Sequence, residues 1–514
     1  MTDEVNILPL PLDHLALRGA RDAPALLFKG FAISHGDMDR RVGRLAEMLR
    51  AQGLDAGERV ATWLGKSWLA CLIPLAAVRA GLVHVPINPL LKRAQVAHIL
   101  GDSGAKLLLV NAGRAASLCE GDVPPHCLVC DDVEWAAQAE RDGAVLPPST
   151  MAPDRLAAIL YTSGSTGRPK GVMLSSANMW LGAQSVAHYL GLRADDRLLG
   201  VLPLSFDYGQ NQLLCAWYAG ASVAPLDYLA AADVVRACER FQATTLAGVP
   251  PLWVQLIDCH WPDETAARLR RLTNSGGALT RRLVERLRAL FPQADLYAMY
   301  GLTEAFRSTY LDPELIDARP DSIGKAIPHA EILVVRPDGS PTDDGEPGEL
   351  VHCGPLVAQG YWQDTARTAE RFKPAPSHSR YGGVAVWSGD NVSRDADGLL
   401  TFVGRDDAMI KSSGNRISPT ELEEACEATG IVAEAVAFGV PDAIVGHAIA
   451  IVARPIGAME EGMAEEQIRA RLRTDLPNFM QPRHVLIRAD LPRNANGKLD
   501  RVAICAAAML ELTS

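Results

Sequence analysis

The chemistry in this chain is most visible in the segment 161–171, Tyr-Thr-Ser-Gly-Ser-Thr-Gly-Arg-Pro-Lys-Gly. Its glycines allow the backbone to approach an anion closely, its N–H and hydroxyl groups can donate hydrogen bonds, and Lys170 supplies a positive charge. Such a segment is suited to holding a polyphosphate. It is not a Walker A loop, which ends in Gly-Lys-Ser/Thr, because Pro169 precedes and Gly171 follows the lysine. Alone it would more often be a surface loop, so its interpretation depends on the segments that accompany it.

Five further segments carry residues suited to nucleotide and carboxylate chemistry. Residues 274–278 form a glycine turn against which a flat ring could lie, and residues 297–304 end a strand with an aromatic ring, a hydroxyl and a carboxylate. Residues 387–390 place a carboxylate after a tight turn, where it could bind ribose hydroxyls. Residues 411–416 place two cations around a glycine, and residues 492–498 end in a lysine on a polar loop. Each segment is weak evidence alone.

The composition is typical of a globular protein rather than a disordered or fibrous one. The chain has 514 residues, of which 48% are hydrophobic and 22% charged. This length is enough for about three domains of ordinary size. The net charge of −11 argues against nucleic acid or an anionic membrane as the main partner, since both attract clustered lysine and arginine.

The sequence favours a cytoplasmic location without a membrane span. Its first residues lack the positive region and apolar core of a signal peptide. The most apolar stretch, 68–91, is interrupted by Arg79 and three prolines, whereas a membrane-spanning helix needs about 20 consecutive apolar residues.

The 10 cysteines are scattered, and only Cys127 and Cys130 form a Cys-x-x-Cys pair. A zinc site would need a second pair of ligands at suitable spacing, which is not visible nearby. A buried pair of thiols is therefore favoured over a metal site.

The elements that must position these segments alternate between apolar strands and amphipathic helices, which predicts parallel sheets with helices on their faces. Residues 32–34 end a strand, and Ser34 leads into a helix. Further strands are predicted at 83–86, 106–110, 198–201, 222–226 and 294–299. Between 338 and 398, turn-rich sequence separates short strands, as in a small β-subdomain.

A new unit is predicted to begin near residue 404. Ser418 is a candidate helix cap, with Pro419 at the first helical position and Glu421 three residues after the cap. Strands near 434–438 and 448–452 and a helix over 465–475 complete a smaller α+β unit. The predicted domains are therefore 1–404 and 405–514.

In order and spacing, the six segments resemble the adenylate-forming (ANL) superfamily, which includes acyl-CoA synthetases, adenylation domains of nonribosomal peptide synthetases and luciferases. The segments 204–209, 300–310 and 320–324 look most like the AMP-forming acyl-CoA ligases associated with exosortase A systems. The resemblance implies an α/β fold: a large N-terminal domain of two parallel-type sheets sandwiched by helices plus a β-subdomain, and a small mobile α+β C-terminal domain. Asp407 would be the hinge between them.

The resemblance also implies a two-step reaction that uses ATP and Mg²⁺. A small carboxylic acid attacks the α-phosphate of ATP, which gives an acyl-adenylate and pyrophosphate. A thiol of coenzyme A, or of the phosphopantetheine of an acyl or peptidyl carrier protein, then displaces AMP to form a thioester. The acid needs no general base because it is ionised at neutral pH. Catalysis then depends on positioning and on cations that stabilise charge on the phosphate.

The resemblance assigns the catalytic roles to three residues. Thr303 would bind the α-phosphate, Glu304 would bind Mg²⁺, and Lys498 would bridge the acid carboxylate and the α-phosphate in the first step. The hydroxyl of Thr162 would lie near the metal.

The resemblance assigns the nucleotide contacts to a larger set. The β- and γ-phosphates would be held by Thr162, Ser163, Gly164, Ser165, Thr166, Gly167 and Lys170. The adenine would be framed by Gly277, Ala278, Leu279, Met299, Tyr300 and Gly301. Asp390 would bind the ribose hydroxyls with help from Arg405, and Arg416 would bind phosphate.

Two positions depart from the pattern of the superfamily. Val386-Trp387-Ser388 stands where the pattern has Tyr-x-Thr before Gly-Asp, and Ser388 keeps the hydroxyl. Phe206 stands where acyl-CoA synthetases often have histidine, and Phe206-Asp207 looks more like amino-acid adenylating domains. Asp207 could pair with a substrate amine, or it could make a structural hydrogen bond to nearby backbone.

Three functions compete at this point. The leading one is an ATP-dependent acid–thiol ligase, and the second is an amino-acid adenylating enzyme that loads a carrier protein. The third is a nucleotide-binding protein without chemistry, against which the intact Lys498, Glu304 and Asp390 argue. The sequence does not distinguish fatty, aryl and amino acids, nor coenzyme A from a carrier protein, because both acceptors present the same thiol arm.

Overall fold

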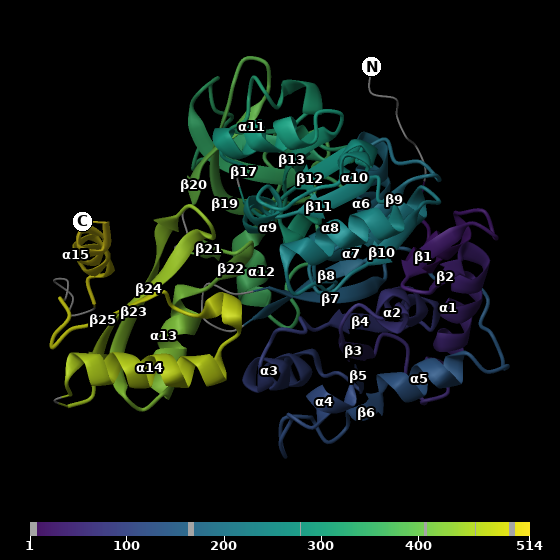
Figure 1. The fold of residues 1–514 in the computed structure, drawn as a ribbon, viewed down its shortest axis with the longest axis horizontal. Coiled ribbons are helices and arrows are strands. Elements are labelled where there is room, and N and C mark those ends of the chain that lie inside the picture. Colours follow the sequence, from purple (N-terminus) through teal and green to yellow (C-terminus); the bar gives the residue numbers. More distant parts are fainter. Residues whose placement is uncertain are drawn as a thin grey trace.

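The computed structural model describes residues 8–162, 169–277, 279–405, 409–457, 459–492 and 499–513. Within these ranges the chain folds into three β-sheets with helices packed on their faces (Figure 1). The mixed α/β architecture with a smaller C-terminal unit confirms the predicted fold class. None of the described helices is both long and apolar enough to cross a membrane.

The first sheet has six strands in the order β6-β5-β3-β4-β7-β8. Its strands are β3 (Arg59–Trp63), β4 (Val83–Pro86), β5 (Leu107–Val110), β6 (Leu128–Asp131), β7 (Leu156–Thr162) and β8 (Lys170–Ser175). Neighbours run parallel except β7 and β8, which are antiparallel and place Thr162 opposite Lys170. The two ends of the predicted phosphate segment are therefore fixed side by side at one end of this pair.

The second sheet has fourteen strands and joins two regions that the sequence suggested were separate. Its parallel part contains β1 (Pro24–Phe28), β9 (Arg197–Gly200), β10 (Ser222–Pro225), β11 (Thr245–Gly248), β12 (Arg271–Asn274) and β13 (Asp295–Tyr300), with β2 (Phe31–Ser34) antiparallel at its edge. Its antiparallel part contains β14 (Thr309–Tyr310), β15 (Ser322–Ala326), β16 (Glu331–Val335), β17 (Pro347–Cys353), β18 (Phe372–Pro374), β19 (Val384–Arg394) and β20 (Leu400–Arg405). The predicted β-subdomain is thus a continuation of the parallel sheet, because β14 pairs with both β13 and β15.

Two helices fix the first two sheets relative to each other. The helix α6 (Ser176–Tyr189) contacts β7 and β8, the helix α7 (Asp207–Tyr218) contacts β9 and β10, and the two helices pack on each other. Both are almost entirely buried, with Trp180 and Trp217 fully enclosed in one hydrophobic core. This layer aligns the strand ends that carry the candidate site.

The remaining N-terminal helices cover the outer faces. They are α1 (His35–Arg50), α2 (Trp68–Arg79), α3 (Arg93–Ser103), α4 (Ala112–Ala115), α5 (Asp132–Ala139), α8 (Ala231–Phe241), α9 (Pro250–Leu256), α10 (Asp263–Arg268), α11 (Arg281–Leu290) and α12 (Thr365–Arg371). Short 3₁₀ turns lie at η1 (Leu12–Leu17), η2 (Thr303–Ala305) and η3 (Pro313–Leu315). The hydroxyl of Ser34 accepts a hydrogen bond from the Asp37 N–H, which confirms the predicted cap of α1.

The C-terminal unit is a five-stranded sheet with helices on both faces. It contains β21 (Ile410–Ser412), β22 (Asn415–Ile417), β23 (Val432–Asp442), β24 (Gly446–Pro455), β25 (His484–Ile487), α13 (Pro419–Ala428), α14 (Glu461–Asp475), η4 (Asn478–Met480) and α15 (Arg501–Thr513). Alternate residues of β23 and β24 face two different clusters, one with α13 and α14 and the other with α15. Ser418 caps α13 with Pro419 at its first position, as predicted.

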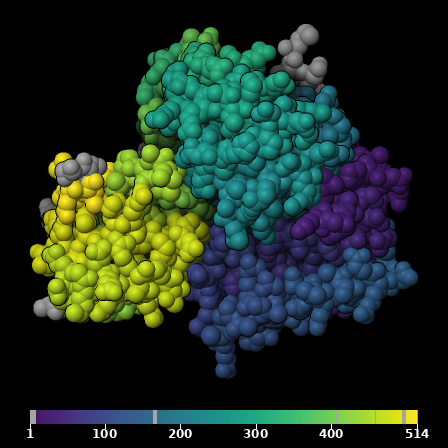
Figure 2. Space-filling view, viewed as in Figure 1, coloured from purple at the N-terminus to yellow at the C-terminus, as the bar shows by residue number. Residues whose placement is uncertain are grey.

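The C-terminal unit packs against the N-terminal part (Figure 2). In this contact the amide of Gln95 on α3 donates a hydrogen bond to Glu421 Oε1 on α13 (3.3 Å) and lies 3.7 Å from the sulfur of Met480. Burial raises the pKa of the Glu421 carboxyl to about 7, the hydrogen bond from Gln95 opposes this effect, and the nearby charge of Glu424 adds to it. Burial of Glu421 therefore favours its protonated form.

We expect the packing of the two units to weaken as pH rises. The pKa of Glu421 is about 7 when the two units are packed, compared with 4.5 for an ordinary glutamate. The stabilisation of the packed state by protonated Glu421 is therefore complete below pH 4.5 and is lost as pH rises through 7. Small-angle X-ray scattering should show expansion between pH 5 and 8.5. Glu421→Gln should remove this expansion, whereas Glu427→Gln, an exposed change on the same helix that is not among the causes of the shift, should keep it. Equal expansion in both variants would contradict the assignment to Glu421.

Candidate active site

A buried charge pair forms the centre of the candidate site. The Nζ atom of Lys170, at the start of β8, lies 3.4 Å from Oε1 of Glu304 in η2. The hydroxyl of Tyr361 accepts a hydrogen bond from Lys170 Nζ (2.6 Å) and donates one to Glu304 Oε1 (2.7 Å). The ammonium group also lies 4.1 Å from the centre of the Tyr361 ring, within range of a cation–π contact. Three segments far apart in the sequence thus meet at one hydrogen-bonded group.

Backbone hydrogen bonds hold Tyr361 in this position. The Ala358 N–H donates to the carbonyl of Glu304 (2.9 Å), and the Trp362 N–H donates to the carbonyl of Gly171 (2.8 Å). A Cβ atom at Gly171 would lie 2.5 Å from Ile159 and 3.3 Å from Trp362, so this close approach requires glycine. The glycine after Lys170 therefore allows β8 to pack closely against Ile159 and, less tightly, against the Tyr361 segment.

The charges around Glu304 keep it ionised. Burial by itself would raise the pKa of this carboxyl, but the charges of Lys170 and Arg416 and the hydrogen bond from Tyr361 lower it to about 2. Burial lowers the pKa of Lys170, and the charge of Glu304 opposes this effect. Arg371 and Arg416 lie close enough to lower the pKa of Lys170 further. Three cations thus surround one carboxylate, and this excess of positive charge is suited to a polyphosphate.

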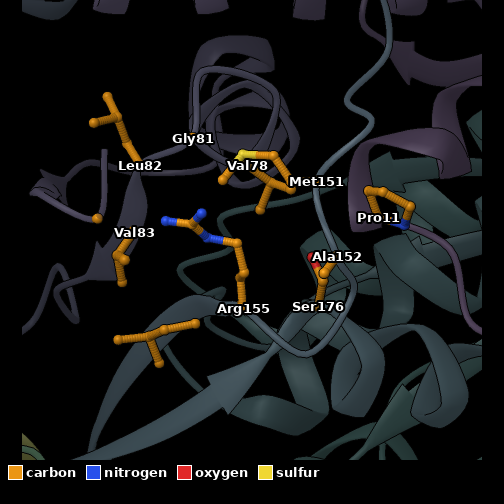
Figure 3. Close-up of a pocket in the computed structure, with 11 residues that line it drawn as sticks. Pro11, Val78, Gly81, Leu82, Val83, Met151, Ala152, Arg155 and Ser176 are labelled. Atoms are coloured by element: carbon orange, nitrogen blue, oxygen red, sulfur yellow. The ribbon is translucent and has the colours of Figure 1, made fainter. Parts of the chain in front are cut away.

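Residues from both units line the hollow beside this pair. Its lining is Leu302, Glu304, Arg371, Val386, Trp387, Ser388 and Arg416. Arg416 belongs to β22 of the C-terminal unit, and Arg371 ends α12. A separate cavity of about 90 Å³, into which Arg155 extends between Val83 and Met151, contains none of the predicted site residues (Figure 3).

The residues present fit a magnesium ion held together with phosphates. The hydroxyl of Thr162 is buried and has no hydrogen-bond partner in the part of the chain that the structure describes, and Glu304 is ionised. The described residues contain no group of three or more His, Cys, Asp or Glu side chains that could hold a metal. Mg²⁺ is commonly bound through one or two carboxylates with substrate phosphates and water supplying the other ligands. One carboxylate and one hydroxyl agree with that mode.

Asp390, the residue predicted to bind the ribose, is buried on the antiparallel part of the second sheet. It is 3% exposed on β19, accepts a hydrogen bond from the hydroxyl of Tyr300, and pairs in register with Arg405 on β20. The hydroxyl of Ser388 accepts a hydrogen bond from the Asp390 N–H (3.1 Å) and donates one to the carbonyl of Leu350 (2.6 Å). Ser388 thus positions Asp390 with the hydroxyl that the sequence comparison expected it to keep.

The predicted adenine residues lie at the ends of the adjacent parallel strands β12 and β13. The amide of Asn274 donates to the carbonyl of Gly277 (2.8 Å), which fixes the turn after β12. Tyr300 and Gly301 follow at the end of β13, and carboxyl ends of parallel strands commonly form nucleotide crevices. The side chains of Met299 and Leu279 are buried in the two cores, so these residues would meet an adenine through their backbone.

The predicted acid residues lie beside Thr303. Phe206 precedes α7 and Asp207 is its first residue. The Thr303 hydroxyl donates to Asp207 Oδ1 (3.3 Å), and Arg307 Nη2 lies 3.9 Å from Asp207 Oδ2. Burial raises the pKa of Asp207, and the charge of Arg307 is the largest opposing effect.

Several predicted residues are not placed by the structure. Ser163, Gly164, Ser165, Thr166, Gly167, Ala278, Asp407 and Lys498 lie outside the described residues, and Arg405 is described for its backbone only. Their roles and the domain boundary at 404 and 405 stay predictions. Conversely, the sequence analysis missed Tyr361, Arg371 and Arg307. Arg307 follows Glu304 by three residues with only Ala305 and Phe306 between them, which is a signal that could have been read.

We expect Tyr361→Phe to destabilise the protein by about 1.5–3 kcal/mol, because it removes a hydrogen-bonding group between two buried charges. Urea denaturation at pH 7 measures this loss. Tyr310→Phe is the matched control, since the Tyr310 hydroxyl makes no hydrogen bond within the described ranges. Equal losses in the two variants would mean that the Tyr361 hydroxyl does not support the charge pair.

The sequence matches two family models in the order of its two units. Residues 13–362 match the AMP-binding enzyme model, and residues 421–498 match the AMP-binding enzyme C-terminal domain. The chain is 32% identical to feruloyl-CoA synthase of an Amycolatopsis species over 94% of this chain and 96% of that one. It is 30% identical to L-proline–[L-prolyl-carrier protein] ligase of Pseudomonas fluorescens over 92% of this chain and 94% of that one.

Other relatives are much longer. The chain spans 10% and 6% of the lengths of two linear gramicidin synthase subunits from Brevibacillus parabrevis. Among solved structures, a malonyl-CoA ligase in a ternary product complex with methylmalonyl-CoA and AMP has a TM-score of 0.78 at 26% identity, over 94% of this chain and 100% of that one. Because the AMP-binding model covers more than half of the sequence, the chain belongs to the AMP-binding enzyme family, within the adenylate-forming superfamily.

Proposed function

We propose that this protein is an acid–thiol ligase that activates a carboxylic acid with ATP and transfers the acyl group to a thiol. The observation that carries the proposal is the ionised Glu304 held by Lys170 and Tyr361, with Arg371 and Arg416 beside it and Thr303 next to it in η2. This arrangement provides cations for a polyphosphate and one carboxylate for its metal. The names of two relatives, a coenzyme A synthase and a carrier-protein ligase, support the same reaction class.

In the first step, a carboxylate oxygen of the acid bonds to the α-phosphorus of ATP while the bond to pyrophosphate breaks. Lys170 offsets the negative charge of the departing phosphates, and the Thr303 hydroxyl lies between the phosphate region and Asp207. Asp390 would hold the ribose at the other end, which fixes the α-phosphate relative to the acid. Bound Mg²⁺ would supply Lewis-acid stabilisation of the phosphate charge, with Glu304 and Thr162 as its protein ligands.

In the second step, the thiol bonds to the acyl carbon and the bond to AMP breaks. The C-terminal unit must then admit the thiol where it had presented Lys498. In this structure the β21–β22 turn faces the site, since a Cβ at Gly414 would lie 3.1 Å from Val249. Leu491 and Leu499, which flank the Lys498 segment, pack in the cluster with α15, which lies away from the N-terminal part (Figure 1). This arrangement supports a rotation about Asp407 between the two steps.

Exchange of labelled pyrophosphate into ATP tests the proposed reaction. A panel of fatty, aryl, amino and dicarboxylic acids should contain at least one acid that supports exchange, and addition of coenzyme A or a carrier protein should then yield a thioester. If no acid of any class supports exchange, the proposed function is wrong.

We expect Lys498→Ala to abolish adenylate formation while thioester formation from a supplied acyl-adenylate stays largely intact. One cation at the reacting phosphate acts only in the first step and is worth about 3 kcal/mol or more in its barrier. The two half-reactions are measured separately, with Lys325→Ala, a change of an exposed lysine, as control. Equal losses in both half-reactions would make Lys498 a structural residue.

We expect Asp407→Pro to impair one half-reaction far more than the other. Proline fixes φ, so a hinge at this position would be held in one of its two states. The ratio of the two half-reaction rates, compared with the unmodified protein, measures the effect. An unchanged ratio would count against rotation about Asp407.

An amino-acid adenylating enzyme is the second candidate, with Asp207 pairing the substrate amine. The relative that acts on proline favours it. Arg307 argues against it, because its guanidinium already lies 3.9 Å from Asp207 and would face the incoming ammonium. The choice between coenzyme A and a carrier protein, the presence of Mg²⁺ and the narrower likeness to exosortase A-associated ligases stay proposals.

A further inference from the structure

Arg307 is a buried cation that the proposed reaction does not use. Its residue is 2% exposed, and its Nη1 donates a hydrogen bond to the Ser275 hydroxyl (3.1 Å). Its guanidinium lies 4.7 Å from the centre of the Tyr208 ring, and the Tyr208 hydroxyl bonds to Thr273. The guanidinium is therefore held in place from two sides. It lies next to Asp207, one of the two residues predicted to contact the acid.

Within the part of the chain that the structure describes, one edge of this guanidinium has no hydrogen-bond acceptor. The Nε atom is buried without a partner among the described residues, and Nη2 lies 3.9 Å from Asp207 Oδ2, beyond hydrogen-bond distance. The Nε and Nη2 donors together form a planar fork that matches the two oxygens of a carboxylate. A buried donor without an acceptor costs free energy, so this edge is suited to an acceptor that arrives with a ligand.

Asp207 is not that acceptor, because it has other partners. It accepts hydrogen bonds from the Thr303 hydroxyl and the Tyr208 N–H, and it stands at the N-terminus of α7, where a negative charge is favoured. Its distance to Arg307 exceeds that of a hydrogen bond. Asp207 thus offsets part of the charge of Arg307 without occupying the fork.

The neighbouring surface of α7 is also polar. Gln210 and Asn211 are 0% and 2% exposed, and the oxygen of each side-chain amide has no hydrogen-bond partner in the described part of the chain. Asn211 follows Asp207 by four residues and so shares its face of the helix. An unbranched aliphatic chain beside these amides would leave them unsatisfied.

The backbone at Phe306 is strained where it delivers Arg307. Phe306 has φ of +56°, a region that bulky residues rarely adopt, and its side chain is fully buried. Strained backbone of this kind is often retained where it positions a functional group. The turn places Arg307 close to Thr303, where the first step of the reaction would occur.

On the basis of the proposed function, we propose that the acid is a short dicarboxylic acid. One carboxylate is adenylated beside Thr303, and the second is bound by the Nε and Nη2 donors of Arg307. The acid is short because Asp207 contacts Thr303 with one oxygen and approaches Arg307 with the other, so that a single side chain bridges the two sites. Malonate, succinate and glutarate are the chemical type.

Pyrophosphate exchange with matched acids tests this proposal. Malonate, succinate and glutarate are compared with propionate, butyrate and pentanoate, and aspartate is included for the amine alternative. We expect kcat/KM for at least one diacid to exceed that of its monoacid by tenfold or more. Arg307→Met should lose this preference by at least tenfold, and Arg307→Lys, which keeps the charge without the fork, should lose most of it.

Two controls separate binding from folding. Arg282→Met removes an exposed arginine from α11 and should keep the diacid preference. Thermal unfolding of each variant shows whether it folds, and if Arg307→Met does not fold, the Arg307→Lys variant carries the test.

The outcomes distinguish this proposal from the function on which it rests. Exchange with monoacids or aspartate in preference to diacids would overturn the dicarboxylic acid and leave the ligase function standing. A diacid preference that survives in the Arg307 variants would also overturn the role of Arg307. Absence of exchange with every acid would contradict the ligase function itself, and the proposed substrate would fall with it.

Discussion

The pairing of Lys170 with Glu304 is the interaction on which the rest of the site depends. Burying two charges costs several kcal/mol per ion, and their attraction offsets this only when geometry and additional hydrogen bonds are good. Tyr361 supplies the additional hydrogen bonds. The backbone on either side of Tyr361 is itself hydrogen-bonded to Gly171, next to Lys170, and to Glu304. The pair can therefore exist only where β8, η2 and the Tyr361 segment meet. The two sheets, aligned by α6 and α7, bring about that meeting.

The same charges couple the two units of the chain. Arg416 lies on the C-terminal unit, yet its charge helps to keep Glu304 ionised. Removing the C-terminal unit from this position would take away Arg416 and leave Glu304 with Lys170, Tyr361 and the nearby Arg371. The position of the small unit is thus linked to the electrostatics of the large one, and bound phosphates would change that link because they compete for the same cations.

Local signals in the sequence were enough to predict much of the fold. Ser34 and Ser418 each combine a capping hydroxyl with an apolar stripe behind it, and both helices begin as predicted. The phosphate segment was read from residue types alone, and its flanking residues Thr162 and Lys170 do lie opposite each other. Such features depend on neighbours in the chain, which is why they can be predicted.

The residues that were missed depend on neighbours in space. Tyr361 is an ordinary aromatic residue in sequence, and only the packing of its segment on Gly171 and Glu304 gives it two charged partners. Apart from its closeness to Glu304, nothing in the sequence distinguishes Arg307 from the other arginines, and only the structure shows its contacts with Ser275 and Tyr208. The joining of the β-subdomain to the parallel sheet escaped prediction for the same reason, because β14 is only two residues long and has no local pattern.

The residues predicted to contact the nucleotide and those proposed to contact the acid come from different elements, which has an evolutionary consequence. The predicted nucleotide contacts come from the ends of β12 and β13 and from β19, which one hydrogen-bonded sheet ties together. The residues proposed to bind the acid instead lie in the first turn of α7 and at Arg307. At the proposed acid site, substitutions in the first turn of α7 would change the preferred acid and leave these strand ends unchanged. Proteins that share this fold would then differ in the acid they bind through substitutions at a few positions. The nucleotide-binding strand ends would stay the same in all of them.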